Sequence, residues 1–346
     1  MVDTRIYRVN ELDSLEVKMD IKEAFMTGKN VVFPTETVYG IGANALDIDG
    51  IKGIYEVKGR PSDNPLIMHV SKEEDVFLYT KNHQPYVRKM MDHFWPGPLT
   101  MVFEKNETVP DLITGGLSTV GVRIPGSAVA RKVIEIAGVP VCAPSANISG
   151  RPSSTLFEHV YDDFYGEVDI IIDGGKSAVG LESTVVDVTG VVPIVLRPGM
   201  ITAEMIKNVV GDVLIEKDSN QNNSPKSPGM KYKHYAPVGE MLIVDGEKED
   251  VINYINRELD QNMLDGALSA VITTSDLLGK FHAKHQFSIG DVAQDEEIAS
   301  NLFMLLRKMD QLKIEKIYSV AFHGGIHEEA IMNRLLKAAN GRMKKV

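Results

Sequence analysis

Polar side chains that could hold a charged ligand recur along residues 30–200, at the ends of short apolar runs. Each one could be a surface cation or a turn residue when taken alone. Together they place cations, hydroxyls, amides and an imidazole where strands end, and α/β proteins build ligand sites at such ends. The candidates are Thr37, Lys58, Arg60, Asn64, His69, Ser118, Thr119, Arg123, Ser145, Asn147, Ser183 and Arg197.

The cations among these candidates suit a polyphosphate. Lys58, Arg60 and Arg197, with neighbouring hydroxyl and amide donors, could each form charge-assisted hydrogen bonds worth roughly 1.5–3 kcal/mol. Residues 33–40 (Phe-Pro-Thr-Glu-Thr-Val-Tyr-Gly) add two hydroxyls, a carboxylate and a phenol directly after a strand. The pattern therefore predicts a site for a small phosphorylated ligand.

Two nucleotide-binding motifs are matched only in part. Gly40-Ile-Gly-Ala-Asn-Ala45 fits the dinucleotide fingerprint, but residues 34–39 form no uninterrupted strand leading into it, and no acid follows at the required place. Gly174-Gly-Lys-Ser177 resembles the end of a P-loop, whose first glycine would have to stand at Ile170. We interpret the glycines of both segments as structural.

The histidines of His323-Gly-Gly-Ile-His327 could bind a metal ion through their imidazoles. They lie at an expected strand-to-helix turn, and no third ligand lies nearby in the sequence. A tight turn is therefore the preferred interpretation. Cys142, the single cysteine, stands in an apolar run and is expected to pack as a small buried side chain without a disulfide.

The elements that must position the candidates alternate between short strands and helices. Their order predicts a large α/β domain over residues 1–202 with a twisted mixed sheet. Strands are expected at 30–33, 66–70, 99–103, 119–124, 139–143, 168–173, 183–188 and 192–196, and helices at 15–27, 51–57 and 128–137.

The composition changes near residues 218–239, which open with Ser, Asn, Gln and Pro and continue with clustered Lys, Tyr and His. Residues 203–239 are therefore expected to form a linker, or lid, that also touches a ligand. Residues 240–346 predict a small three-layer, Rossmann-like α/β domain with a parallel sheet. Its strands are expected at 241–244, 268–273 and 316–322, and its helices at 250–259, 298–312 and 328–339.

Composition and charge exclude several classes of protein. The chain has 346 residues, of which 43% are hydrophobic and 25% charged, as in globular proteins. No run approaches the length of a membrane helix, the N-terminus is too polar for a secretory signal, and a cytoplasmic location is expected. Residues 201–346 hold 21 acidic residues and 18 Lys or Arg, so their net charge is −3 and that of residues 1–200 is −8. Strong direct nucleic-acid binding is not expected from this charge.

At this point the motifs resemble a known family. Residues 33–40, Lys58-Gly-Arg60 and Ser145-Ala-Asn147 are similar to the signature of YrdC-type domains. Residues 227–237, Ser-Pro-Gly-Met-Lys-Tyr-Lys-His-Tyr-Ala-Pro, resemble the linker of the long, two-domain threonylcarbamoyl-AMP synthases. The resemblance covers essentially the whole chain, and it implies a YrdC-like domain with a concave ligand cleft.

The resemblance implies an activity and a set of site residues. A nucleotidyltransferase of this family converts ATP, L-threonine and bicarbonate to threonylcarbamoyl-AMP and pyrophosphate, and a separate enzyme transfers the threonylcarbamoyl group to a tRNA adenosine. Lys58 and Arg60 would be catalytic. Threonine would be held by Thr37, His69, Arg123, Ala143 and Ser183. ATP would be held by Lys58, Arg60, Asn64, Ser118, Ser145, Asn147, Ser153, Arg197 and Tyr235, with Thr119 and Thr155 as alternatives to Ser118 and Ser153.

Magnesium is expected to arrive with the ATP phosphates, with no ligand assigned to the protein and a role for Glu36 left open. Tyr232 and Tyr235 are expected to close the linker over the nucleotide. The alternatives are an RNA-binding module, which the acidic charge disfavours, and a hydrogenase-maturation carbamoyltransferase, whose zinc-finger and acylphosphatase modules this chain has no room for. No residue of 240–346 is expected to be catalytic, and a regulatory role for this segment stays open.

Overall fold

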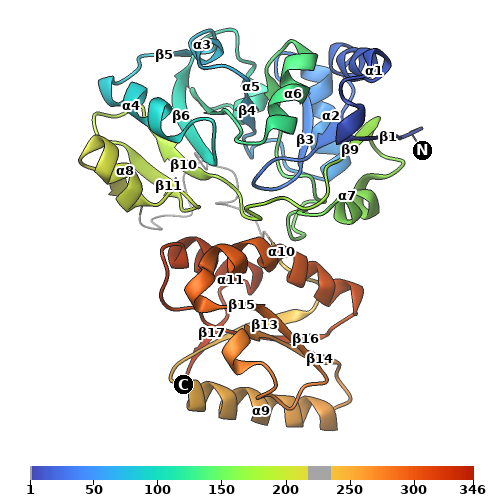
Figure 1. Cartoon of the computed structure of the whole chain (residues 1–346), viewed down its shortest axis with the longest axis vertical. Coiled ribbons are helices and arrows are strands. Elements are labelled where there is room, and N and C mark those ends of the chain that lie inside the picture. Colours follow the sequence, from blue (N-terminus) through green and yellow to red (C-terminus); the bar gives the residue numbers. More distant parts are fainter. Residues whose placement is uncertain (1, 217–234) are drawn as a thin grey trace. The chain divides into compact units, whose positions relative to one another are not determined.

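The computed structural model describes residues 2–216 and 235–346. Contacts divide the chain into two compact units, which Figure 1 shows coloured along the sequence. Unit 1 comprises Met1–Ser149, Ser153–Ala178 and Glu182–Tyr232, and unit 2 comprises Gly150–Pro152, Val179–Leu181 and Lys233–Val346. Most of the linker motif, including Tyr232, lies outside the described residues. The expectation that Tyr232 closes over a nucleotide therefore stays a prediction.

Unit 1 is built on one 12-stranded mixed sheet, which confirms the α/β prediction. Parallel pairs, such as β4 with β7, stand beside antiparallel pairs, such as β6 with β7. The strand order is β1 (Arg5–Arg8), β9 (Ile170–Asp173), β2 (Val31–Phe33), β3 (Gly40–Asn44), β8 (Val141–Cys142), β4 (Ile67–His69), β7 (Thr119–Arg123), β6 (Leu99–Lys105), β10 (Thr184–Asp187), β11 (Ile194–Arg197) and β12 (Leu214–Ile215), with β5 (Thr80–Lys81) paired to β6.

The helices of unit 1 begin and end where the sequence supplies caps. Before α6, the Ser127 hydroxyl accepts a hydrogen bond from the Ala130 amide, and Gly138 ends the helix with a φ of 69°. Asp47 and Gly59 cap α2 in the same way. The helices are α1 (Leu15–Met26), α2 (Ile48–Lys58), α3 (Glu73–Val76), α4 (Pro85–Phe94), α5 (Asp111–Thr114), α6 (Ala128–Ala137), α7 (Phe157–Phe164) and α8 (Ala203–Val210).

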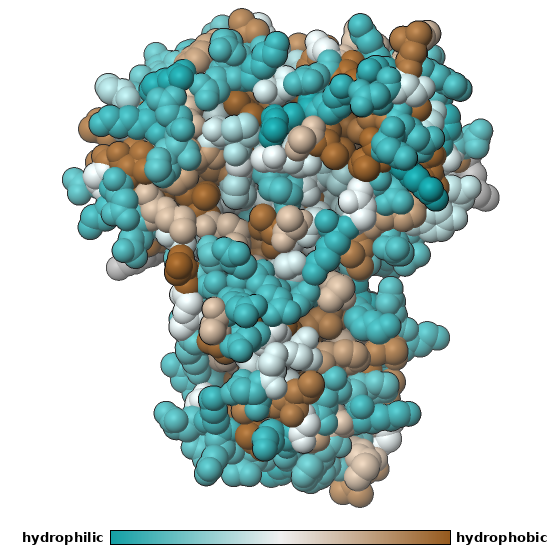
Figure 2. Space-filling view, in the orientation of Figure 1, coloured by the Kyte–Doolittle hydropathy of each residue, from teal (hydrophilic) through white to brown (hydrophobic). Residues whose placement is uncertain are grey.

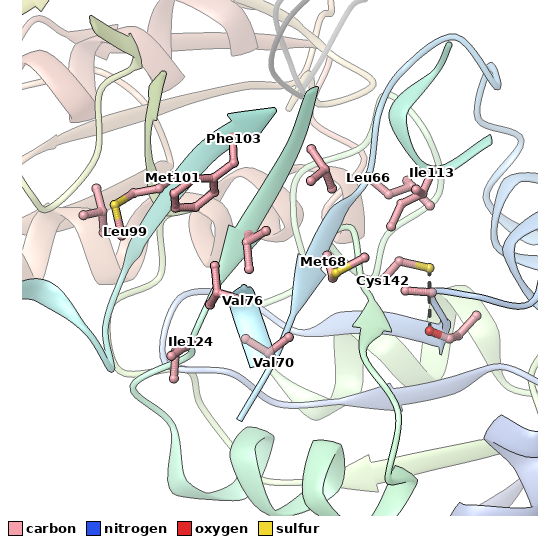
Figure 3. Close-up of a cluster of buried hydrophobic side chains, with 14 of the residues drawn as sticks. Leu66, Met68, Val70, Val76, Leu99, Met101, Phe103, Ile113, Ile124 and Cys142 are labelled. Atoms are coloured by element: carbon pink, nitrogen blue, oxygen red, sulfur yellow. Dashed lines mark hydrogen bonds between the residues drawn. The ribbon is translucent and has the colours of Figure 1, made fainter. Parts of the chain in front are cut away.

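A continuous apolar core fixes the strands that carry the candidate site residues. Figure 3 shows part of this core, where side chains of β4, β6 and β8 pack together. Cys142 lies within it, as predicted, with its thiol 3.6 Å from the Ala43 carbonyl oxygen. Burial raises the pKa of the Cys142 thiol to about 12, so the thiolate is not accessible near neutral pH.

The glycines of residues 40–45 serve packing, as interpreted from the sequence. They lie in β3, a strand that the sequence analysis did not predict, which is antiparallel to both β2 and β8. A Cβ atom added to Gly42 would lie 2.7 Å from a ring carbon of Phe33 and 2.8 Å from a methyl group of Val141. Only glycine lets three neighbouring strands approach this closely.

The linker expected from residue 203 begins later in the structure. Residues 203–210 form α8, whose N-cap is the Thr202 hydroxyl, accepting from the Met205 amide. Leu214–Ile215 then pairs in parallel with β11 as strand β12. This segment folds onto unit 1 because its apolar positions, Ile206 above all, complete the core of that unit.

Unit 2 is a three-layer α/β domain, as predicted. All of its strand pairs are parallel, in the order β15 (His285–Gly290), β14 (Ser269–Thr274), β16 (Lys316–Val320), β13 (Glu240–Asp245) and β17 (Met343–Lys345). In Figure 1, α9 (Lys248–Leu264) covers one face of this sheet, and α10 (Asp295–Gln311) and α11 (Glu328–Ala338) cover the other. The sequence analysis missed the two outer strands, the partly buried β15 and the exposed β17.

One face of the molecule can be compared with its core. Figure 2 shows hydrophilic residues over most of the visible face, with apolar residues in small separate patches. Among the described residues, no helix combines the length and apolar character needed to cross a bilayer. The apolar residues are gathered instead in the cores of the two units.

Candidate functional site

Arg123, at the end of β7, is the centre of a buried polar cluster in unit 1. Its Nη1 donates to the Thr37 hydroxyl oxygen at 2.9 Å, its Nη2 to Glu36 at 2.5 Å, and its Nε to the Gly97 carbonyl at 3.1 Å. A guanidinium has five N–H donors, so these three bonds leave two for a ligand. This count refers to the described residues, and a carboxylate is the partner that two guanidinium donors can bind together.

Glu36 holds Arg123 in place from the opposite side. One carboxylate oxygen also accepts from the Gly126 amide at 2.7 Å, and the other accepts from the Ser127 amide at 3.1 Å. Burial by itself raises the pKa of Glu36. The Arg123 charge and the Gly126 hydrogen bond together lower it by a larger amount, so the pKa lies below its ordinary value. Both oxygens of this ionised group are engaged, and Glu36 is poorly suited to bind a metal ion.

His69 lies beside Arg123 as a neutral imidazole. The two residues are register partners at the ends of the parallel strands β4 and β7. Burial and the Arg123 charge lower the pKa of His69 to about 3. Its Nδ1 atom is buried without a hydrogen-bond partner among the described residues, which leaves it available to a ligand.

A second arginine completes this side of the site. Arg197, at the end of β11, donates through Nη2 to the Ser183 carbonyl at 2.8 Å and to the Ser183 hydroxyl at 3.3 Å. The Ser183 hydroxyl also lies 2.8 Å from that of Thr100. The backbone amide of Thr184 bonds to the Pro98 carbonyl, next to Gly97, so Ser183 and Arg123 lie on adjoining segments.

Lys58 forms the third part of the site. It is the last residue of α2 and only 1% exposed, and its ammonium donates to the carbonyls of Ser145 and Asn147, the former at 2.6 Å. The Ser145 hydroxyl in turn bonds to the Asn147 side chain at 2.6 Å. Buried lysines are rare because an ammonium loses hydration when it is buried, so this one is held for a purpose beyond packing.

Arg60 and Asn64 lie on the loop that follows α2. Arg60 donates to the carbonyls of Asn64 and Pro65, at 3.3 and 3.0 Å. The side-chain oxygen of Asn64 is buried and has no hydrogen-bond partner among the described residues. The loop is therefore ordered by the guanidinium while one amide oxygen remains for a ligand.

Residues 143–147 connect these clusters. The Ala143 amide bonds to the Ile67 carbonyl, two residues before His69, and Ser145 bridges to Gly40 of β3. The same segment supplies the two carbonyls that hold Lys58. The predicted residues of unit 1 therefore form two groups that residues 143–147 join. His69 and Arg123 end β4 and β7, with Thr37, Ser183 and Arg197 beside them, whereas Arg60, Asn64 and the carbonyls that hold Lys58 lie near the amino end of β4. We call the two groups together the site edge.

Ser153 and Thr155 both lie buried near this edge. The Ser153 hydroxyl donates to Glu182 at 2.5 Å, and Glu182 directly precedes Ser183. The Thr155 hydroxyl has no hydrogen-bond partner among the described residues. Ser153 is thus tied to the Ser183 segment, while Thr155 keeps an uncommitted hydroxyl.

Ser118 lies on the side of the second group, at the amino end of β7 and away from Arg123. It precedes β7, whereas Arg123 is the last residue of that strand. Five strand residues span roughly 16 Å. Thr119, the next residue, lines a small cavity together with Pro65, whose carbonyl accepts from Arg60. The choice between Ser118 and Thr119 as an ATP contact stays open.

Tyr235 belongs to unit 2. Its side chain is buried, with its ring centroid 5.1 Å from that of Phe303 and 5.9 Å from the Arg334 guanidinium. Its place in the proposed ATP contacts therefore stays a prediction.

The His323–His327 pair has separate partners. His323 bonds to Asp245, whereas His327 bonds to Asp295. Among the described residues, no group of three His, Cys, Asp or Glu side chains is arranged to hold a metal ion.

The sequence analysis gave no positioning role to three residues that order the site. Glu36 was considered only as a metal ligand. Thr35, which accepts from the Thr37 amide, and Thr100, which bonds to Ser183, were not considered. Thr100 is the single hydroxyl in the apolar run Leu99–Phe103, and a buried hydroxyl of that kind needs a partner. This contrast is the signal that could have identified it.

Comparisons with known proteins agree with the geometry. The family model described as "Telomere recombination" matches residues 23–199, and the model described as "Threonylcarbamoyl-AMP synthase, C-terminal domain" matches residues 201–340. The threonylcarbamoyl-AMP synthase of Pyrococcus abyssi is 44% identical over 338 residues, 96% of both chains. The chain belongs to the threonylcarbamoyl-AMP synthase family. The Bacillus subtilis family member is 43% identical over 90% of both chains.

Solved structures of this family have the same fold. A Pyrococcus abyssi Sua5 structure superimposes with a TM-score of 0.93 at 42% identity, covering 99% of this chain and 98% of the other. A second Pyrococcus abyssi Sua5 structure, complexed with L-threonine, gives a TM-score of 0.91 at 41% identity and covers 99% of both. The resemblance stated from the sequence is therefore confirmed at the level of family and fold.

Proposed function

We propose that this chain is an L-threonylcarbamoyladenylate synthase, a nucleotidyltransferase that makes threonylcarbamoyl-AMP from ATP, L-threonine and bicarbonate and releases pyrophosphate. The observation that carries the proposal is the buried edge of unit 1, where Arg123 keeps two N–H donors beside a neutral His69 and Lys58 and Arg60 line the adjoining segment. This arrangement supports an amino-acid pocket next to a phosphate pocket.

L-Threonine would bind around Arg123. The two remaining N–H donors would pair with its carboxylate, and the Thr37 and Ser183 hydroxyls would orient its polar groups. His69, because it is neutral, would accept a hydrogen bond through Nδ1 without repelling the ammonium. Ala143 would border the pocket through its backbone.

ATP would lie along the cation-rich part of the edge. Lys58 and Arg60 would contact its phosphates and Arg197 would lie between nucleotide and threonine. Asn64 would donate or accept through its amide. The remaining contacts would come from Thr119 or Ser118, Ser145, Asn147, and Ser153 or Thr155.

The chemistry requires alignment more than a catalytic dyad. The amine of threonine combines with carbon dioxide from bicarbonate to give a carbamate, and a carbamate oxygen then attacks the α-phosphorus of ATP while the bond to pyrophosphate breaks. Lys58 and Arg60 would stabilise the charge that develops on the leaving pyrophosphate. Magnesium would enter as the counter-ion of ATP, since Glu36 is committed to Arg123.

The product would serve tRNA modification through another enzyme. A mixed anhydride of a carbamate and a phosphate is a labile acyl donor, so a transferase must use it soon after release. The net charge of −11 does not favour strong binding of tRNA by this chain itself. We expect the reaction to take place in the cytoplasm.

A steady-state assay of pyrophosphate release tests the assignment of the pockets. Arg123→Lys keeps the charge but removes the bidentate fork, so the KM for threonine should rise at least tenfold while that for ATP changes little. Arg60→Lys should do the reverse. Equal changes in both KM values for both variants would refute the division of the edge into two pockets.

A further inference from the structure

Unit 2 contains a cleft that the proposed reaction does not use. It has a volume of about 190 Å³ and lies at the carboxyl ends of β13, β14 and β16. Residues 245–248 after β13, Asp276 and Leu277 after β14, and His323 after β16 form its rim.

The strand order places this cleft where an α/β domain binds ligands. From β13 the chain passes through α9 to β14, on one side of β16, and from β16 it passes through α11 to β17, on the other side of β13. Because the two crossovers run in opposite directions, α9 and α11 cover opposite faces of the sheet, as Figure 1 shows. The loops therefore separate above the neighbouring strands β13 and β16, and such a switch point is where open sheets of this kind bind small molecules.

Charges of both signs line the cleft, two pairs of them together with Glu247. The Lys248 ammonium lies 2.6 Å from the Asp276 carboxylate, and the His323 imidazole lies 2.7 Å from that of Asp245. The Asp245 hydrogen bond raises the pKa of His323, and a weaker contact at 3.5 Å with Glu328 acts in the same direction. A ligand that carries both a positive and a negative group could place each group beside a side chain of opposite charge, so that no charge is left without a partner.

The floor and walls of the cleft are apolar. Four valines line it, namely Val244, Val251, Val292 and Val320, together with Leu277. Its volume is below the roughly 300–1,000 Å³ of sites for drug-sized ligands, so the cleft suits a small organic molecule better than a nucleotide.

We propose that this cleft binds a small α-amino acid with an apolar side chain, separately from the threonine pocket of unit 1. The ammonium group would face Asp245 and Asp276, the carboxylate would face Lys248 and His323, and the side chain would pack on the valines. The site would give unit 2 the role of sensing free amino acids.

Titration of the full chain with L-valine tests this proposal by isothermal calorimetry and by NMR of its valine methyl groups. We expect L-valine to bind and to shift the methyl signals of the four cleft valines. Isobutylamine, which lacks the carboxylate, and isovalerate, which lacks the ammonium group, should each bind at least tenfold more weakly. Binding of either analogue as tight as that of L-valine would overturn the proposal.

Variants separate this cleft from the proposed active site. Lys248→Met and Asp276→Asn should each weaken L-valine binding at least tenfold, while Lys284→Met, at an exposed position of the same unit outside the cleft lining, should leave it unchanged. Binding that is lost in Arg123→Lys but retained in Lys248→Met would assign it to unit 1 and refute the proposal. Pyrophosphate release by Lys248→Met, without added valine, should stay at the wild-type rate. The binding measurements themselves do not require the proposed function, so failure of one proposal can be told from failure of the other.

Discussion

Acidification should destabilise unit 1 through one buried side chain, His69. Its pKa is about 3 in the folded protein and about 6.5 in an unfolded chain. A histidine whose folded pKa is lowered favours folding above its unfolded pKa, and this contribution is lost as pH falls below about 6.5. At pH 5 the unfolded chain gains a proton at this position that the folded protein does not accept.

The magnitude depends mainly on the unfolded pKa, because pH 5 is still well above the folded value. Between pH 7.5 and pH 5.0, proton binding to His69 stabilises the unfolded chain, and the folded protein gains almost nothing from it. With a pKa of about 6.5 in the unfolded chain, the free energy of unfolding therefore falls by about 2 kcal/mol. Other groups titrate in the same range, so the quantity of interest is the difference between wild type and His69→Gln. The variant should lose about 2 kcal/mol less unfolding free energy over this pH change.

Urea unfolding followed by the fluorescence of Trp95 measures this difference. Trp95 is the single tryptophan and lies buried in unit 1, so its signal reports that unit alone. His93→Gln is the matched control, since His93 is an exposed histidine of the same unit. The same pH dependence in wild type and His69→Gln would refute a neutral, buried imidazole beside Arg123.

Three further predictions concern the same edge and its core. Lys58→Met should lower the turnover of pyrophosphate release by about 100-fold, because a buried ammonium beside the phosphates is lost; a change below threefold would contradict its role. Glu36→Gln should raise the KM for threonine and lower the stability of unit 1 by about 3 kcal/mol in urea, because it leaves the Arg123 charge without its partner; an unchanged KM would show that Glu36 does not orient Arg123. Cys142 should resist iodoacetamide at pH 8 in the native protein and react fully in urea, as read by intact mass; rapid native labelling would contradict its burial.

The sequence predicted the architecture where apolar periodicity was regular. The parallel sheet of unit 2 follows from the alternation of strands and helices, and the expected positions of its inner strands match β13, β14 and β16 to within two residues. Strand β1 was missed because Arg5–Arg8 carries two arginines and is largely exposed. Strand β3 was missed because Gly40 and Gly42 resemble a turn until the close approach of its neighbours is known.

The candidate site was likewise predictable only in part. Residue types and strand ends singled out cations that the structure buries, and buried Lys and Arg require partners. Partners distant in the sequence could not be predicted, because Glu36 and Arg123 are 87 residues apart and meet only through the pairing of β4 with β7 and the approach of residues 33–40.

The most direct test of the account is mass spectrometry of the product formed with carbon-13 bicarbonate. The purified chain is mixed with ATP, magnesium, L-threonine and the labelled bicarbonate, and each substrate is omitted in turn. The account predicts threonylcarbamoyl-AMP that carries a single carbon-13 and forms only when threonine, bicarbonate and ATP are all present, and its loss in Arg123→Lys at low threonine. Failure to form this product, or a product without the label, would contradict the account.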